Sequence, residues 1–370
     1  MTVLAQHSWL LVPLAVLLAV AFIFLLVPLA HKFGWVDHPN ARKVHDDATP
    51  LVGGVAIFMA LSGLIWLSPI STLASGPFYL VLLWGAFAML LTGLVDDLRG
   101  LTATMRFIIQ IGLCLLMVRY AHVHLTDFGQ LFTSSIFTLG WAAVPITVFA
   151  AMGVINAFNL IDGMDGLSGT IFLIAAAGML LFAVLSADWA VFWLLLITMA
   201  SVLGFLLLNA RLPWNEKARV FLGDAGALML GFILAWCFIR LGSGSEPAMM
   251  PMTAVWLFAL PLLDTSTLIW LRWRDGRSAF SADQHHLHHA FLRAGYSVGQ
   301  TWAVMLLLAS GLAAIGIGFE FSGLPDWLSF YTFMALAFVY YFYVKHSWAT
   351  QCFLGRHFIH HDFTIEEGYA

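Results

Sequence analysis

The feature that most constrains this chain is a series of eleven apolar runs, each close to the length that crosses a lipid bilayer. A membrane-spanning helix needs about 20 mostly apolar residues, because the hydrocarbon core of a bilayer is about 30 Å thick. The runs lie at residues 8–30, 51–70, 78–95, 104–118, 141–158, 167–185, 189–208, 220–241, 250–270, 301–319 and 327–344. They predict an all-α polytopic membrane protein, with one integral-membrane domain over residues 1–370 and a tail over residues 345–370.

Composition excludes several other classes of protein. Hydrophobic residues make up 61% of the chain and charged residues 10%, whereas a soluble domain is nearer half apolar and a quarter charged. A soluble enzyme and a disordered chain are therefore excluded, and a net charge of −4 provides no basic surface for nucleic acid. Cys114, Cys237 and Cys352 lack metal-binding spacing and are interpreted as small buried apolar residues. The N-terminus has no basic segment or cleavage site, so we expect the first run to be retained.

Lys and Arg are distributed unevenly between the two sides that the runs define. Of the 16 such residues, only Arg119 and Arg240 fall outside the loops that follow odd-numbered runs. Cytoplasmic loops are enriched in these residues. The pattern therefore predicts an external N-terminus and a cytoplasmic C-terminus, which requires an odd number of spans.

Acidic residues gather at the same predicted cytoplasmic ends. Asp96 and Asp97 close the third run, with Arg99 and Arg106 shortly after them. Two adjacent carboxylates repel each other unless a cation offsets their charge. The pair is thus either part of a functional site or a solvated polar end of a membrane helix.

A second motif carries oxygen-bearing side chains at a spacing of three. Asn156, Asn159, Asp162 and Asp165 follow one another in this way, with glycines at 163 and 166. On a helix this spacing places neighbours on one face. Asp-Gly pairs are also common in turns, but a turn does not explain two Asn side chains in the last turn of a membrane helix. Hard cations such as Mg²⁺ prefer such oxygen ligands.

The third motif opens the eighth run. Asp224 lies between Gly223 and Gly226 at a predicted helix N-terminus. A carboxylate there stabilises the helix dipole, so helix capping is the alternative to a functional role. An ionisable residue at the edge of the hydrocarbon is nevertheless a functional candidate, and Asp224 is the first choice for a metal ligand.

The longest loop combines arginines with histidines. It holds Arg272, Arg274, Arg277, Asp283, His285, His286, His288 and His289. Imidazole suits zinc, but no cysteine lies nearby. Arg binds phosphate oxygens through two parallel hydrogen bonds, so phosphate binding fits the loop better than zinc. A loop that contacts lipid headgroups would explain the arginines but not the histidines.

Together these motifs resemble the polyprenyl-phosphate N-acetylhexosamine-1-phosphate transferase family, over about residues 34–295. The carrying motifs are Asp96–Asp97, residues 156–166, residues 221–226 and the His loop. Residues 277–283 and the His286–His289 segment resemble the bacterial branch that starts O-antigen and related glycans on undecaprenyl phosphate, typically from UDP-GlcNAc. Ala227 is one departure, since the family often has Ser there.

The resemblance implies specific roles for these residues. Mg²⁺, with Mn²⁺ as an alternative, would be held near Asn159 and Asp224, and nucleotide contacts would lie around Asp162 and Asp165. The His loop would hold the sugar-diphosphate end, and the Asp pair would serve the lipid phosphate. The implied catalytic residues are Asp96, Asp97, His286 and His288, and the implied substrate-binding residues are Asn156, Asp162, Asp165, Arg274, Arg277 and His289.

The implied reaction joins a UDP-N-acetylhexosamine to undecaprenyl phosphate and releases UMP, at the cytoplasmic face of a bacterial inner membrane. Because the second pKa of a phosphate monoester is about 6, the lipid phosphate needs little base, and direct attack is favoured over a covalent Asp intermediate. The alternatives are another UDP-N-acetylhexosamine, a structural scaffold, and a secondary transporter, for which Asp264 would be the midplane acid. The sequence leaves a homodimer open.

Overall fold

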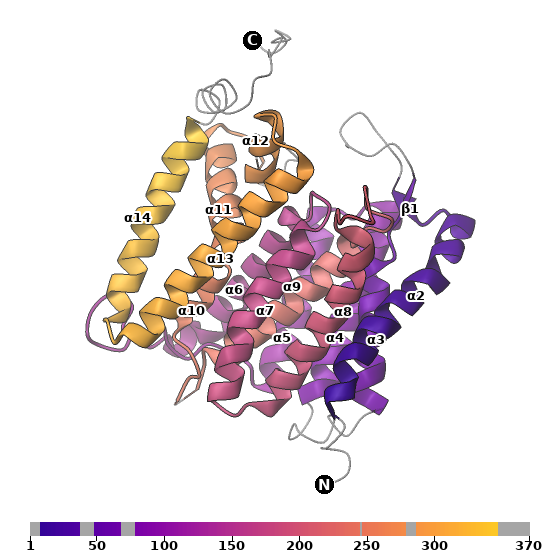
Figure 1. Cartoon of the computed structure of the whole chain (residues 1–370). Helices are drawn as coiled ribbons and strands as arrows, with labels where there is room; N and C mark the ends of the chain where they lie inside the picture. The colour runs from indigo at the N-terminus through magenta and orange to yellow at the C-terminus, as the bar shows by residue number, and fades with distance from the viewer. Residues whose placement is uncertain (1–7, 38–47, 68–77, 245, 279–285, 347–370) are drawn as a thin grey trace.

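The computed structural model describes residues 8–37, 48–67, 78–244, 246–278 and 286–346. Within them the chain is almost entirely helical (Figure 1). The elements are η1 Ser8–Leu10, α2 Leu11–Phe33, β1 Val36–Asp37, β2 Thr49–Pro50, α3 Gly53–Leu67, α4 Phe78–Arg99, α5 Ala103–Ala121, η3 Gly140–Ala142, α6 Ala143–Ile161, α7 Leu167–Leu185, α8 Trp189–Asn209, α9 Gly223–Leu241, α10 Pro251–Leu257, α11 Ala259–Arg274, α12 Leu287–Arg293, α13 Val298–Ser322 and α14 Asp326–Lys345.

The prediction of a polytopic all-α protein is confirmed. In the described residues, nine helices are long and apolar enough to cross a membrane, and a bent pair makes up to ten. Helix α3, at the second predicted run, has 15 residues and is shorter than a full span. A two-residue antiparallel ribbon, which pairs Val36 with Pro50, is a small exception to the all-α prediction. The predicted tail lies outside the described residues from 347 onward.

The ninth predicted run is not one straight helix. It folds as α10 and α11, which meet at Phe258 with a bend of 83°. Pro261 explains the break, because proline has no N–H and its ring clashes with the carbonyl four residues earlier, here that of Leu257. The predicted span over residues 250–270 is therefore present as a bent pair of helices rather than as one helix.

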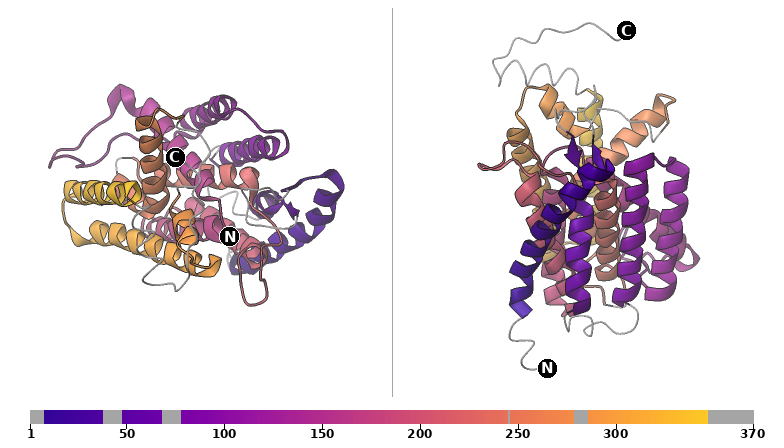
Figure 2. Two further views of the ribbon diagram at one scale, coloured as in Figure 1. Left: turned by 90° about the horizontal axis from the view of Figure 1, so that it is seen from above. Right: turned by 90° about the vertical axis from the view of Figure 1, so that its right-hand side faces the viewer.

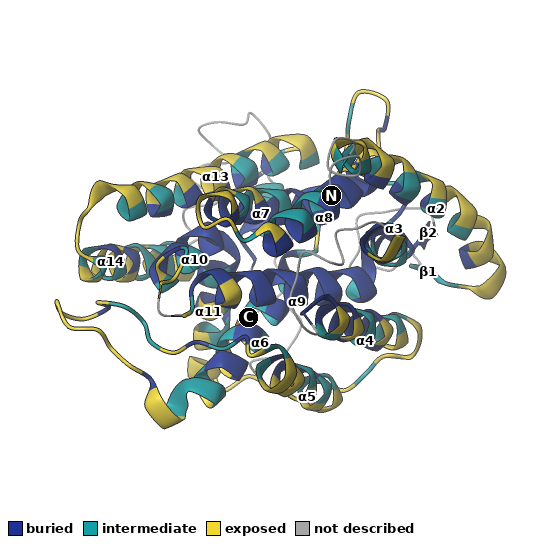
Figure 3. Ribbon diagram, turned by 90° about the horizontal axis from the view of Figure 1, so that it is seen from below, coloured by how far each residue is buried: buried dark blue, intermediate teal, exposed yellow. Residues whose placement is uncertain are grey.

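Helix α9 forms the centre of the bundle (Figure 3). Nearly all of its residues are buried, and it packs against α3, α4, α6 and α7. Small residues allow the closest of these contacts. A Cβ at Gly93 of α4 would lie 2.2 Å from the carbonyl oxygen of Asp224, and one at Gly54 of α3 would lie 2.3 Å from Cα of Gly226. These glycines hold the ends of α3 and α4 directly against the start of α9.

The outer helices expose apolar side chains. Large hydrophobic residues with more than half of their surface exposed lie on α2, α5, α6, α13 and α14, and include Leu17, Ile108, Phe149, Leu307 and Phe338. Such a surface is unfavourable in water and suits contact with lipid. The described part of the chain is therefore a multi-span membrane protein.

The described chain begins and finishes on opposite sides of the bundle. In Figure 1, α2 starts at the bottom and α14 finishes at the top. The ribbon of β1 and β2 and the short helix α12 lie at the top in Figure 1, and the right-hand view of Figure 2 shows the ribbon at the same end. Opposite ends agree with the predicted odd number of crossings, whereas which end faces the cytoplasm stays a prediction.

Candidate active site

The site forms where α4 ends and α9 begins. The side chain of Asp97 accepts hydrogen bonds from the backbone N–H groups of Asp224 (2.9 Å) and Ala225 (3.2 Å). The first N–H groups of a helix have no partner within the helix, and α9 has no capping side chain of its own. Asp97 therefore caps a helix that lies more than 120 residues away in the sequence, and it holds Asp224 at the top of the bundle.

Asn159 and Asp224, the two predicted metal ligands, lie in direct contact. Nδ2 of Asn159 donates to Oδ1 of Asp224 at 2.6 Å. Asn159 is in the last turn of α6 and Asp224 in the first turn of α9, and these helices pack side by side. The tertiary structure thus brings together two oxygen-bearing groups that the sequence separates by 65 positions.

Asp96 makes different contacts from its neighbour. Its Oδ2 forms an ion pair with Nη1 of Arg106 at 2.9 Å, and its Oδ1 accepts from the backbone N–H of Leu101 at 2.7 Å. Only 8% of the side chain of Asp96 and 26% of that of Arg106 are exposed. Arg106, which sequence analysis placed only near the pair, is therefore a positive group held at the edge of the site.

Asp162 caps the end of α6 and faces the same cluster. It accepts a hydrogen bond from Oγ of Ser168 at 2.6 Å. Burial, with smaller contributions from the negative charges of Asp224 and Asp165, raises the pKa of Asp162 to about 7, although the Ser168 hydrogen bond opposes the rise. A carboxyl in this environment favours either a proton or a nearby cation.

Asp165 is oriented by the loop before α9. It accepts from Nε of Arg211 at 2.9 Å and from the backbone N–H of Ala218 at 3.4 Å. Asn209 links the same two regions, because it accepts from the N–H of Gly166 (2.8 Å) and donates to the carbonyl of Val220 (2.9 Å). The turn with the two acids and the start of α9 are therefore fixed relative to each other.

The donor set fits a hard divalent cation. Asp97, Asp162 and Asp224 interact as like charges, and the amide oxygen of Asn159 is a further neutral oxygen donor once the amide is rotated. Oxygen-only ligands favour Mg²⁺ or Mn²⁺ over zinc. Within the described residues, no three His, Cys, Asp or Glu side chains already surround a common point as in a complete metal site.

The His segment enters the site at the start of α12. Nδ1 of His286 lies 2.7 Å from Oδ2 of Asp264, and both side chains are buried. His288 is 1% exposed, neither of its ring nitrogens has a hydrogen-bond partner, and its Nε2 packs against Gly163. Burial, followed by the charges of His289, His286 and Arg293, lowers the pKa of His288. His288 is therefore a neutral ring beside the Asp162 turn, with unused hydrogen-bonding capacity.

Three predicted substrate-binding residues are engaged elsewhere. Asn156 donates to Oε1 of Gln110 and to the carbonyl of Met152, both at 2.8 Å. Arg274 and Arg277 pair with Asp275 at 2.8 and 3.5 Å and are exposed. His289 lies next to His288, with the two ring centres 4.2 Å apart. The predicted residues 279–285 of the His loop lie outside the described residues.

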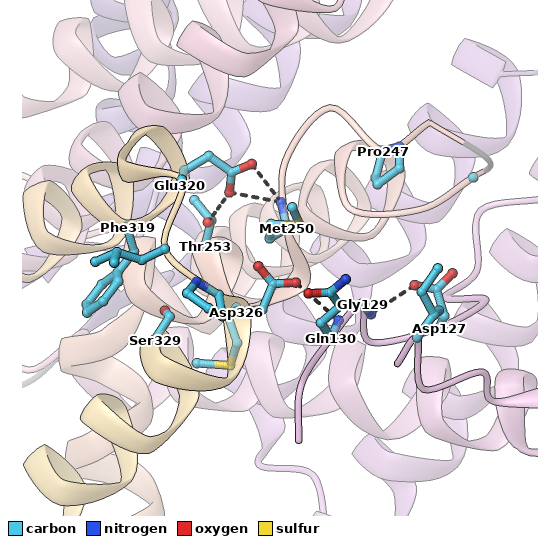
Figure 4. A pocket seen from close by; sticks show the side chains of 16 residues that line it. Asp127, Gly129, Gln130, Pro247, Met250, Thr253, Phe319, Glu320, Asp326 and Ser329 are labelled. Atoms are coloured by element: carbon cyan, nitrogen blue, oxygen red, sulfur yellow. Dashed lines mark hydrogen bonds between the residues drawn. The ribbon is translucent and has the colours of Figure 1, made fainter. Parts of the chain in front are cut away.

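A second acidic region lies at the opposite end of the bundle. A cavity of about 490 Å³ there is lined by residues that include Asp127, Glu320 and Asp326 (Figure 4). Glu320 accepts from Thr253 and from the N–H of Met250, and Asp326 accepts from the N–H of Gln130 at 3.1 Å. None of the described residues that line this cavity is a Lys or an Arg. The α4–α9 end, where Arg106 lies beside the acids, is the candidate site.

Sequence analysis did not select several residues that orient the site. Ser168, Asn209, Arg211 and Tyr340 carry no motif, and Asp264 was considered only as a transporter acid. Each acts through a partner more than five positions away. The sequence offered a clue only for Arg106, because this cation follows Asp96 and Asp97 closely along the chain.

Comparison with known proteins gives a consistent picture. The family model described as glycosyl transferase family 4 matches residues 79–242. The chain is similar to proteins named undecaprenyl-phosphate alpha-N-acetylglucosaminyl 1-phosphate transferase, with 32% identity to that of Escherichia coli K12 over 90% of both chains. The Salmonella typhi protein is 31% identical over 90% of both chains, and the Haemophilus influenzae protein is 35% identical over 89% of this chain and 92% of its own.

Proposed function

Because the chain belongs to glycosyl transferase family 4, we propose that it transfers GlcNAc 1-phosphate from UDP-GlcNAc to undecaprenyl phosphate and releases UMP. The names of its bacterial relatives support both the sugar and the lipid. Such a transfer is the first membrane step of an O-antigen or a related cell-surface polysaccharide. The same reaction with another UDP-N-acetylhexosamine is the alternative.

One observation carries this proposal: the contact of Asn159 with Asp224, at the helix end that Asp97 caps. This contact brings carboxylate and amide groups together at one end of the helix bundle, beside Arg106 and the His segment. A reaction between a long-chain lipid phosphate and a water-soluble diphosphate needs charge neutralisation and positioning at such a boundary. The site therefore suits phosphoryl transfer between a lipid and a nucleotide sugar.

The proposed transfer consumes no acid and no base. An oxygen of the lipid phosphate attacks the phosphorus that carries the sugar, a new P–O–P bond forms, and the bond to the UMP oxygen breaks. The lipid phosphate is largely dianionic at neutral pH, since its second pKa is about 6. UMP leaves as the anion that accepts the bonding electron pair.

The chain's own residues position the reacting groups in this scheme. Arg106, held by Asp96, offsets negative charge on the lipid phosphate, and Asp162 and Asp165 orient the nucleotide. His286 and His288 contact the diphosphate end of the sugar nucleotide. Asn159 and Asp224 would hold Mg²⁺, with Mn²⁺ as an alternative, and a cation held there would supply positive charge that offsets the negative charge of the diphosphate.

The transporter alternative has one new argument in its favour and one against it. Broken helices are common in transporters, and α10 and α11 form such a break. However, Asp264, the candidate midplane acid, is bonded to His286 and Tyr340. An acid whose oxygens are already used does not line a transport pathway, so we retain the transferase.

The orientation is tested by cysteine labelling in intact cells. Ser135 lies in the exposed loop between α5 and α6, and Ser278 lies in the exposed segment after α11. We propose a cytoplasmic site, so Ser135→Cys should react with an impermeant thiol reagent and Ser278→Cys should react only after lysis. The reverse result would place the site on the outer face.

The activity is tested with purified protein, undecaprenyl phosphate and a panel of radiolabelled UDP-sugars. Label from UDP-GlcNAc should become lipid-soluble in a one-to-one ratio with released UMP. Preference for UDP-GalNAc would support the alternative sugar. Enzyme verified to be free of lipid should not exchange labelled UMP into UDP-GlcNAc, whereas exchange at the turnover rate would establish a covalent intermediate.

A further inference from the structure

A buried carboxylate that takes no part in the carboxylate cluster holds the His segment. Asp264 lies in the second turn of α11 and is 1% exposed. A carboxylate without partners is costly to bury, so its hydrogen bonds must account for its presence. They come from two other parts of the molecule, the start of α12 and helix α14.

Asp264 uses both of its oxygens. Oδ1 accepts from the hydroxyl of Tyr340 at 2.7 Å and from the backbone N–H of Leu287 at 3.1 Å. Oδ2 lies 2.7 Å from Nδ1 of His286. The pair of contacts to consecutive residues fixes the backbone as well as the ring of the His segment, and Tyr340 fixes the carboxylate.

This geometry favours one tautomer of the imidazole. Oδ1 of Asp264 already accepts two hydrogen bonds, and a carboxylate that also accepts on Oδ2 favours the tautomer of His286 with its proton on Nδ1. Nε2 is then the ring atom left for a ligand, and it has no hydrogen-bond partner among the described residues. A partner on one ring nitrogen commonly decides the state of the other in catalytic and metal-binding histidines.

The oriented ring is linked to the candidate site. His286 stacks on His288, with ring centres 5.8 Å apart and an angle of 15° between the planes. His288 in turn packs with its Nε2 against Gly163, the residue that follows Asp162. The position of Asp264 is therefore transmitted through two rings to the turn that carries the acids.

We propose that Asp264, supported by Tyr340, is a positioning residue for the transfer reaction, because it holds His286 with Nδ1 protonated and Nε2 free for the diphosphate of the sugar nucleotide. This inference rests on the proposed function, which supplies the diphosphate. The bend at Phe258 contributes to this arrangement, because α11, which carries Asp264, starts in a new direction directly after it.

The test is a double-mutant cycle with Asp264→Asn and His286→Asn. Asn at 264 keeps the shape and an oxygen acceptor, but its amide N–H can donate to Nδ1 and so favours the other tautomer of His286. We expect kcat to fall about 10- to 100-fold, and the affinity for UDP-GlcNAc to weaken about three- to tenfold, because Nε2 of His286 contacts the diphosphate of the bound substrate. In the His286→Asn background, Asp264→Asn should lower kcat by less than twofold.

An additive cycle would overturn the inference, because a purely structural Asp264 would affect both backgrounds equally. Wild-type kcat in Asp264→Asn would also overturn it. Asp188→Asn is the matched control. Asp188 pairs with Arg240 at 3.0 Å and caps α8 at the other end of the bundle, and Asn is an equally good cap, so kcat should stay within twofold of wild type.

If Asp264→Asn does not yield a monodisperse protein, Tyr340→Phe gives the same information. It removes one donor to Oδ1 and leaves the His286 contact, so we expect a three- to tenfold lower kcat that disappears in the His286→Asn background. An equal loss in both backgrounds would contradict the inference.

The proposed function and the inference fail separately. Absence of lipid-soluble product from wild-type protein refutes the proposed function. The same cycle measured on UDP-GlcNAc affinity by calorimetry still tests the positioning role, with coupling between positions 264 and 286 as the supporting result and additivity as the contrary one.

Discussion

The two ends of the bundle use acidic residues in different ways. At the α4–α9 end, Asp97, Asp162 and Asp224 lie close enough for their charges to interact. At the opposite end, Glu320 and Asp326 each accept backbone N–H groups from a neighbouring segment and so hold loops against α10 and α14 (Figure 4). At the opposite end one like-charge contact, between Glu320 and Asp326, is accompanied by hydrogen bonds from the protein to both acids. At the α4–α9 end three carboxylates repel one another, which favours a ligand with positive charge.

Asp224→Asn gives the largest expected difference between the two ends. The substitution keeps the shape of the side chain but removes the charge that faces Asn159, so transfer should fall on the order of 10²–10³-fold. Initial rates with saturating UDP-GlcNAc and undecaprenyl phosphate measure the loss, and gel filtration checks folding. Near-wild-type activity at limiting Mg²⁺ would refute the metal assignment.

Asn159→Ala should have a smaller effect on the same contact. Removal of the amide leaves Asp224 without its 2.6 Å partner, so we expect about a tenfold lower kcat and a higher Mg²⁺ requirement. A titration of Mg²⁺ at fixed substrates measures both. If only the KM for UDP-GlcNAc changed, Asn159 would instead be a nucleotide contact.

Asp97→Asn separates capping from chemistry. The amide oxygen still satisfies one of the two N–H groups at the start of α9, so the variant should fold, with a stability loss of about 1 kcal/mol. Direct attack by the lipid phosphate predicts residual activity, about tenfold below wild type. Complete loss together with UMP exchange in lipid-free wild-type protein would point to a nucleophilic Asp.

Glu320→Gln gives the smallest expected effect on activity. Glu320 accepts from Met250 and Thr253 at the end far from the site, so transfer should change by less than twofold. Loss of the charge in these hydrogen bonds should lower stability by about 1 kcal/mol, which thermal unfolding in detergent detects. A tenfold fall in transfer with an unchanged melting temperature would break the comparison between the two ends.

Hydropathy by itself located most of the membrane helices, because the thickness of a bilayer sets a length that each apolar run meets or misses. It did not fix their number, since eleven spans were predicted and the described residues hold nine, or up to ten with the bent pair. Pro261 favours a break near Phe258, but α2 continues through Pro28, so the proline by itself did not determine the bend. The short helix α3 shows the limit of this approach, since a 15-residue helix lies within a predicted run of about 20 apolar residues.

Local motifs identified Asn159, Asp162 and Asp224 as candidates, because acids and amides at the ends of apolar helices have few purely structural explanations. Only the tertiary structure decided which partners such residues contact. Asp97 caps a helix formed 127 positions later, and Asn156 faces Gln110 rather than the cluster. The physical reason is that hydrogen bonds act over about 3 Å in space, whatever the sequence separation of the groups. Helix packing around α9, and not spacing along the chain, therefore set which acid meets which partner.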